Sequence, residues 1–129
     1  HEVVQKVVPR SPRELRGEQL LAILHAYLDS PLAERVKSEY CRITEAQELP
    51  LVTLPESALF YAEQTFGEDP GPEAADELLH AFEEAVIREA YQEAVRNLRR
   101  AEGSADTVAI ENAQAKCTKL AARLAAFDH

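Results

Sequence analysis

The first quarter of the chain places four leucines on one stripe at helical spacing, at positions 20, 21, 24 and 28. Ahead of them, Ser11-Pro12-Arg13-Glu14 has the form of a capping box, in which a serine oxygen accepts an unpaired backbone N–H of the first helical turn. A residue that precedes proline avoids helical geometry. The pattern therefore predicts a helix from Ser11 that ends at Asp29-Ser30-Pro31.

Further helix starts follow. Ser30-Pro31 opens a second predicted helix, on which residues 32, 36 and 40 form an apolar stripe. Thr44-Glu45-Ala46-Gln47 predicts a short helical turn that ends at Pro50, and Thr53-Leu54-Pro55-Glu56 predicts a helix that runs to Phe66, with Gly67 as a left-handed cap. The Pro- and Gly-rich segment 67–72 is the strongest break in the chain and predicts a hinge between two halves.

The second half predicts two long antiparallel helices, from about Pro72 to Ala101 and from about Ala105 to Phe127, joined by a turn at 102–104. Apolar residues on both recur every 3.5 residues, which is typical of a narrow seam shared by two helices. The predicted seam includes Ile87, Tyr91, Leu98, Ile110, Cys117, Leu120 and Leu124. The lower part of the first long helix carries a wider apolar stripe, which indicates contact with further neighbours.

The sequence thus predicts an all-α fold, an N-terminal helical bundle followed by a long antiparallel helical hairpin. Residues 1–10 are interpreted as the remnant of a linker, 11–71 as the bundle, and 72–129 as the hairpin, whose base packs on the bundle. Composition supports this prediction, because strong helix formers dominate and only 6% of the residues are aromatic.

The formal net charge of −9 makes nucleic acid a poor candidate for the main ligand, although an acidic excess is also typical of an ordinary solvated surface. No segment approaches the roughly 20 apolar residues that span a bilayer, so we expect no membrane contact. Cys41 and Cys117 have no metal-like spacing and favour a reducing, cytoplasmic compartment. A chain that starts at His1 and contains no Met is interpreted as a piece of a longer polypeptide.

The sequence contains few candidate catalytic or metal-binding residues. Glu77 and His80 form one Glu-x-x-His, the spacing used in di-metal helical bundles, but such sites need two of these motifs and two more glutamates. A surface ion pair or helix cap is the simpler interpretation. No serine, threonine or cysteine has a His or Lys at a spacing that indicates a nucleophile. We therefore expect no metal, no cofactor and no catalytic residue, and the fragment is predicted not to be an enzyme.

Basic residues concentrate on the predicted hairpin. They are Arg96, Arg99, Arg100, Lys116, Lys119 and Arg123. Cations near a helix C-terminus complement the helix dipole, which suffices to explain the first three. The alternative is that all six form a partner-binding patch, suited to an acidic segment of another protein.

Three segments carry a resemblance to a known family. They are Glu18-Gln19-Leu20-Leu21-Ala22-Ile23-Leu24, then Asp29-Ser30-Pro31-Leu32-Ala33-Glu34-Arg35-Val36, and Asn97-Leu98-Arg99-Arg100-Ala101-Glu102-Gly103. In order and spacing the chain from Ser11 onward resembles the C-terminal, helicase-binding domain of a bacterial DnaG-type primase. The stretch between Tyr40 and Pro70 is shorter than the middle helices of that family.

The resemblance implies a protein-interaction module in the bacterial cytoplasm. It would dock a primase onto the N-terminal domain of the replicative DnaB-type helicase and modulate priming and unwinding, while the catalytic centre lies in other domains of the parent enzyme. The acidic tail of single-stranded-DNA-binding protein is a second candidate partner. The residues alone also allow a generic acidic helical adaptor or regulator, or a fragment of an enzyme such as a di-metal bundle.

Overall fold

A computed structural model describes residues 10–127, and these residues form five helices and no strand, so the all-α prediction is confirmed. The predicted linker remnant lies, except for Arg10, outside the described residues. The helices are α1 (Pro12–Ala26), α2 (Pro31–Thr44), α3 (Glu56–Phe66), α4 (Asp76–Ser104) and α5 (Thr107–Ala125).

The first two helices begin where the capping pattern predicts. Ser11 Oγ accepts a hydrogen bond from the backbone N–H of Glu14 at 3.1 Å, and Ser30 Oγ accepts one from Ala33 at 3.0 Å. In both helices proline occupies the first turn, where its missing N–H costs no hydrogen bond. The serine caps therefore fix the N-terminal ends of α1 and α2.

Two predicted caps are wrong. Thr44 does not start a helical turn; it is the last residue of α2, and its hydroxyl donates to the carbonyl of Tyr40 at 2.8 Å. Glu45 follows in the left-handed conformation, with φ of 57°, and ends the helix. Thr53 does not cap α3 either, because the N-cap position is taken by Pro55 and carries no side-chain hydrogen bond.

The ends of the long helices also differ from the prediction. α4 starts at Asp76 rather than near Pro72, because residues 72–75 form turns. At the other end α4 continues through the predicted turn to Ser104, and Ala105 takes the left-handed conformation with φ of 59°. Asp106 then caps α5, since its Oδ1 accepts hydrogen bonds from the backbone N–H groups of Val108 and Ala109 at 3.1 and 3.2 Å.

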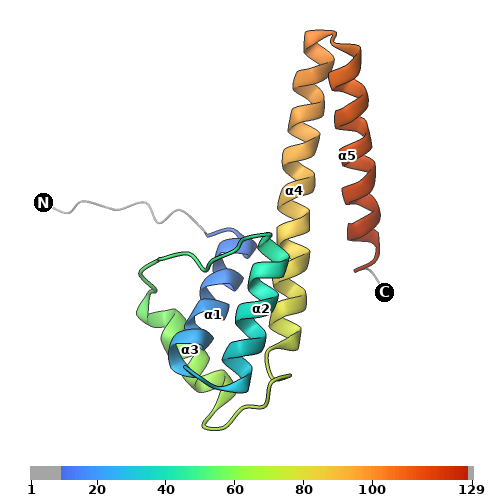
Figure 1. Cartoon of the computed structure of the whole chain (residues 1–129). Helices are drawn as coiled ribbons and strands as arrows, with labels where there is room; N and C mark the ends of the chain where they lie inside the picture. The colour runs from blue at the N-terminus through green and yellow to red at the C-terminus, as the bar shows by residue number, and fades with distance from the viewer. Residues whose placement is uncertain (1–9, 128–129) are drawn as a thin grey trace, which may run out of the picture.

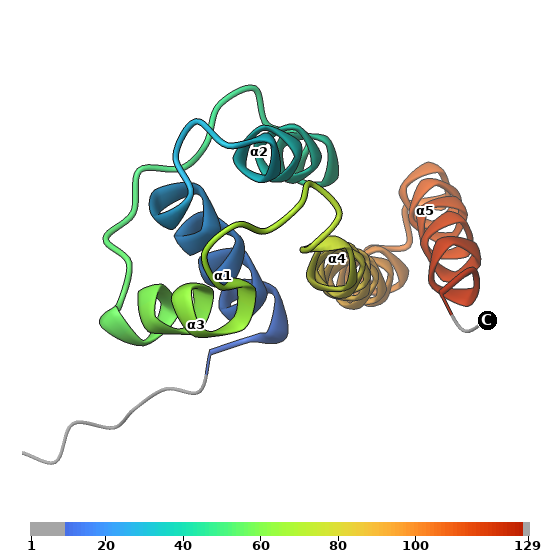
Figure 2. The same cartoon turned by 90° about the horizontal axis from the view of Figure 1, so that it is seen from below.

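The helices are arranged around α1 and α4. Within residues 10–127, α1 packs against α2, α3 and α4, whereas the only helix that α5 packs against is α4 (Figure 1). The larger core lies between α1, α2, α3 and the first part of α4, and its most deeply buried large side chains are Leu20, Ile23, Leu32, Val36 and Phe82. Viewed from below, α3 and α5 lie on opposite sides of the molecule (Figure 2).

A second, smaller core joins α4 to α5. Ile87, Ala94 and Leu120 are buried in it, and Tyr91, Cys117, Leu124 and Phe127 are half-buried around them. Leu98 and Ile110, nearer the tip, are also half-buried. Because α5 has no other neighbour among the described helices, one face of it stays open to solvent along its length.

Candidate functional site

The described surface contains a groove of about 630 Å³ where α5 faces the C-terminal end of α2 across α4. We call it the basic groove. Its cations are Arg13, Arg42, Lys116, Lys119 and Arg123. Its floor is apolar and is formed by Ile43, Val86, Ile87, Ala90 and Leu120. Two carboxylates, Glu45 and Glu83, also line the groove, so its cations exceed its acids by three.

The spacing along α5 explains how three of the cations reach one face. Lys116, Lys119 and Arg123 stand at positions i, i+3 and i+7, which lie above one another on a helix. Leu120 lies among them and is buried against α4, so the three charged side chains flank the apolar floor. Packing of α5 on α4 therefore directs this basic face into the groove.

Arg42 comes from the last turn of α2 and is held by two carboxylates. Its guanidinium donates hydrogen bonds to both carboxylate oxygens of Glu83 at 3.0 and 3.2 Å and to Glu39 at 2.7 Å. These hydrogen bonds raise the pKa of Arg42 above its usual value. The bidentate contact with Glu83 ties α2 to α4 and gives this cation a fixed position at the edge of the groove.

A second group of charged side chains lies around Glu93, which is closer to the C-terminal end of α4 than the residues of the basic groove. The Arg96 guanidinium donates to this carboxylate, and that hydrogen bond is the main reason why the pKa of Glu93 lies below its ordinary value. The nearby positive charges of Arg96, Arg100 and Lys116 lower the pKa of Glu93 further. Arg96, Arg100 and Lys116 therefore lie close to one carboxylate.

The structure thus places the six predicted partner-binding residues in two groups and one separate position, and all six are exposed. Lys116, Lys119 and Arg123 line the basic groove, while Arg96 and Arg100 lie near Glu93. Arg99 is not among the cations that lower the pKa of Glu93, and because a helix turns roughly 100° per residue, its direction differs from that of Arg100 by about that angle. Their role in binding a partner stays a prediction.

Sequence reasoning missed Arg13 and Arg42, which belong to the basic groove but come from α1 and α2. Both are more than 70 positions from Lys116 in the sequence, and no spacing rule joins residues so far apart. The only signal in the sequence was the wide apolar stripe at the start of α4, which indicated that the bundle lies beside it.

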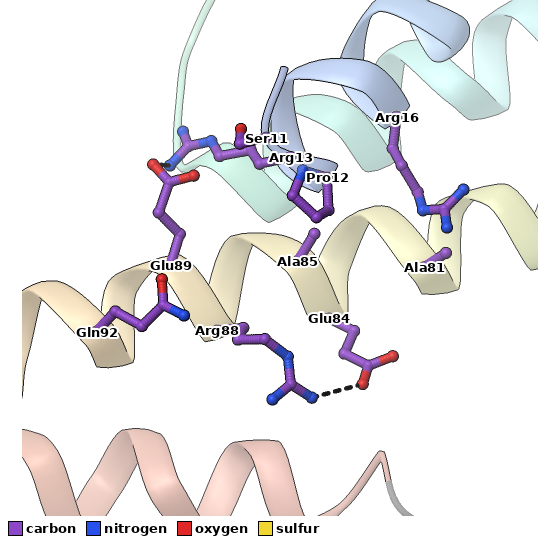
Figure 3. A pocket seen from close by; sticks show the side chains of 10 residues that line it. All are labelled: Ser11, Pro12, Arg13, Arg16, Ala81, Glu84, Ala85, Arg88, Glu89 and Gln92. Atoms are coloured by element: carbon purple, nitrogen blue, oxygen red, sulfur yellow. Dashed lines mark hydrogen bonds and ion pairs between the residues drawn. The ribbon is translucent and has the colours of Figure 1, made fainter. Parts of the chain in front are cut away.

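A smaller pocket of about 280 Å³ lies between the start of α1 and α4, where Ala81 and Ala85 project toward α1 (Figure 3). Its arginines are largely compensated. Arg88 pairs with Glu84 at 2.9 Å, and Arg13 lies 3.6 Å from Glu89. Arg13 and Arg42 of the basic groove are paired in the same way, but within the described residues Lys116, Lys119 and Arg123 form no ion pair, so the smaller pocket is the weaker candidate for an acidic ligand.

Among the described residues, Glu77 and His80 of the Glu-x-x-His motif are not joined by a third possible metal ligand. The ring of His80 lies 4.7 Å from that of Phe127, measured between centroids, so this histidine packs against the end of α5. Between residues 10 and 127 no group of three or more His, Cys, Asp or Glu side chains is arranged to hold a metal ion. Cys41 and Cys117 are half-buried free thiols.

None of the helices in this part of the chain is both long enough and apolar enough to cross a membrane. Comparisons of the chain with protein-family models, with curated proteins and with solved structures found no match. The basic groove is therefore interpreted from its own chemistry.

Proposed function

We propose that this chain is a protein-interaction module, in which an N-terminal bundle (11–71) supports a helical hairpin (72–129) that binds an acidic surface of another protein. The observation that carries the proposal is the basic groove, which gathers five cations over an apolar floor on a chain of net charge −9. Exposed cations steer an acidic partner toward the groove, and the apolar floor gives it surface to bury.

We further propose that the partner is the N-terminal domain of a replicative DnaB-type helicase. Support for this identity comes from the resemblance of segments 18–24, 29–36 and 97–103 to the helicase-binding domain of DnaG-type primases. The module would then attach a primase to the helicase and would itself carry no catalytic step. The acidic tail of single-stranded-DNA-binding protein suits the same groove, because it supplies the opposite charge.

The proposal is tested by reversing charge inside and outside the groove. The groove variant combines Lys119→Glu with Arg123→Glu, and a matched control combines Lys37→Glu with Arg88→Glu, which are also exposed and lie outside the groove. Both pairs change the net charge equally and should alter stability by no more than about 0.5 kcal/mol, since exposed substitutions rarely do more.

Binding to the cognate helicase N-terminal domain is measured by titration calorimetry at several salt concentrations. We expect the groove variant to bind at least about tenfold more weakly and with a smaller dependence on salt, whereas the control keeps most of its affinity. Equal affinities of the two folded variants would move the contact away from the groove. Failure of the unmodified chain to bind the helicase, together with groove-dependent binding of an acidic tail peptide, would favour the generic adaptor.

A further inference from the structure

The negative charge of this protein is concentrated in one stretch of the sequence. Residues 43–87 contain eleven Asp and Glu and no Lys or Arg, which gives a net charge of −11. The remaining residues contain twelve acids and all fourteen bases, which gives +2, and the two parts sum to the −9 of the whole chain. Charge is therefore distributed very unevenly along the sequence, although Glu45 and Glu83 of this stretch line the basic groove.

Within this acidic stretch, α3 exposes an apolar surface. The side chain of Phe60 is 64% exposed and lies with Leu59, Glu56 and Glu63 around a shallow hollow of about 470 Å³. These four residues stand at positions i, i+3, i+4 and i+7, so they share one face of the helix. We call this face the acidic ridge.

The acidic ridge and the basic groove are complementary in charge and in layout. On α5, Lys116, Lys119 and Arg123 flank Leu120 within a span of the same length, i to i+7, that holds the ridge on α3. The ridge surrounds Phe60 and Leu59 with two carboxylates, and the α5 side of the groove surrounds Leu120 with three cations, while Glu45 and Glu83 lie elsewhere in the groove. The exposed ring of Phe60 is an apolar side chain that an open groove with an apolar floor can accept.

The ridge cannot reach the groove of its own molecule. Among the described helices, α3 packs only against α1 and α5 only against α4, with α1 and α4 lying between them (Figure 2). Contact between the two surfaces therefore requires a second copy of the chain. Because two different surfaces meet, such a contact is head-to-tail and produces open chains or rings rather than a closed symmetric pair.

From this geometry we propose that the chain self-associates head-to-tail, with the acidic ridge of one copy seated in the basic groove of the next. The association does not rest on the proposed helicase contact, since it involves this chain alone. It occupies the surface that an acidic partner would use, so self-association and partner binding exclude each other at the groove.

Sedimentation velocity of the whole chain tests this proposal. We expect the sedimentation coefficient to rise with concentration up to about 0.5 mM at low salt, the range in which weak contacts of this kind populate. The rise should disappear at about 0.5 M salt, where exposed charges are screened beyond roughly 4–5 Å. Two variants are compared: the ridge variant Glu56→Lys with Glu63→Lys, and the groove variant Lys119→Glu with Arg123→Glu.

Each variant should stay monomeric alone, because its ridge and its groove then carry the same sign. An equimolar mixture should associate again, because each reversed surface meets a partner of opposite sign. The control Lys37→Glu with Arg88→Glu should associate like the unmodified chain. Circular dichroism verifies that every variant is folded, and Glu63→Gln or Arg123→Gln replaces any that is not, with a smaller expected loss.

Three outcomes would overturn the proposal. The unmodified chain could remain monomeric over the whole concentration range at low salt. Association could persist in the folded ridge or groove variant. The mixture of the two variants could remain monomeric, which would show that the ridge and the groove do not pair with each other.

Discussion

Gly17 is a buried position at which helix propensity and core packing make opposite predictions. It lies in the middle of α1, where alanine is ordinarily favoured over glycine by about 0.5–1 kcal/mol. A Cβ atom at this position would lie 3.2 Å from Cε1 of Phe82, which is closer than ordinary van der Waals contact. Phe82 is 1% exposed and its ring stacks on Tyr40 with centroids 5.1 Å apart, so the ring has little room to move.

We expect packing to dominate. Displacing a fixed core side chain for one added methyl group costs about 1–3 kcal/mol, so Gly17→Ala should lower the free energy of unfolding by about 0.5–2 kcal/mol. In Phe82→Leu the side chain ends at Cδ and does not reach the position of Cε1. The steric conflict is then absent, and Gly17→Ala should raise the stability of that variant by about 0.5–1 kcal/mol. The coupling energy between the two positions is therefore about 1–3 kcal/mol.

Urea unfolding of the four proteins in this double-mutant cycle, followed by far-UV circular dichroism, measures the coupling directly. Phe82→Leu alone should cost about 1–2 kcal/mol, mainly through loss of the aromatic stack with Tyr40 and of buried volume. The reasoning would be refuted if Gly17→Ala stabilised the unmodified protein by about 1 kcal/mol. That result would mean that Phe82 gives way without cost.

Two further predictions concern the smaller core and the pH dependence of stability. Leu120→Ala should lower the free energy of unfolding by about 2–4 kcal/mol, because Leu120 is buried between α4 and α5. Val108→Ala, at an exposed position near the tip, should change the free energy of unfolding by less than about 0.5 kcal/mol. Equal losses of the two variants in urea unfolding would contradict this. Burial raises the pKa of Tyr40 above its ordinary value of 10.0, so its contribution to stability is complete below pH 10.0 and is lost as the pH rises toward the folded-state pKa. Urea unfolding between about pH 9 and 11 should show a smaller loss of stability for Tyr40→Phe than for the unmodified protein, and identical pH profiles would contradict this.

The helices were predictable where a local signal fixed their ends. Ser11 and Ser30 each precede proline and can accept a backbone N–H, and both begin helices as predicted. Gly103 misled the prediction, because a glycine near the end of a helix usually marks its C-cap. Here Asp106 fixes the start of α5 with two backbone hydrogen bonds, and α4 continues past the glycine until Ala105 takes the left-handed conformation.

The candidate site was predictable only in part. The three groove cations on α5 share a helix face and could be grouped from their spacing, but Arg42 joins them only through the packing of α2 on α4. Spacing also failed to separate Arg99 from Arg100, whose neighbouring positions place them on different flanks of α4. Proximity in the sequence does not decide which charges lie together on a helix. The direction in which each side chain leaves the helix axis decides it.

The helix α4 belongs to both hydrophobic cores, and this has a mechanical consequence. Its 29 residues span roughly 43 Å at 1.5 Å per residue, and neither proline nor glycine interrupts it before Gly103. Sharp bends in helices arise almost always at such residues or at bulges, so we expect α4 to move as one rigid helix. Its first part is fixed in the larger core by Phe82 and its neighbours. If α4 tilts by about 10° where it is packed in the larger core, its C-terminal end moves by roughly 5 Å, because about 30 Å of the helix extends beyond that core. Small shifts in the packing around α1 and α2 are therefore magnified at the tip of α4.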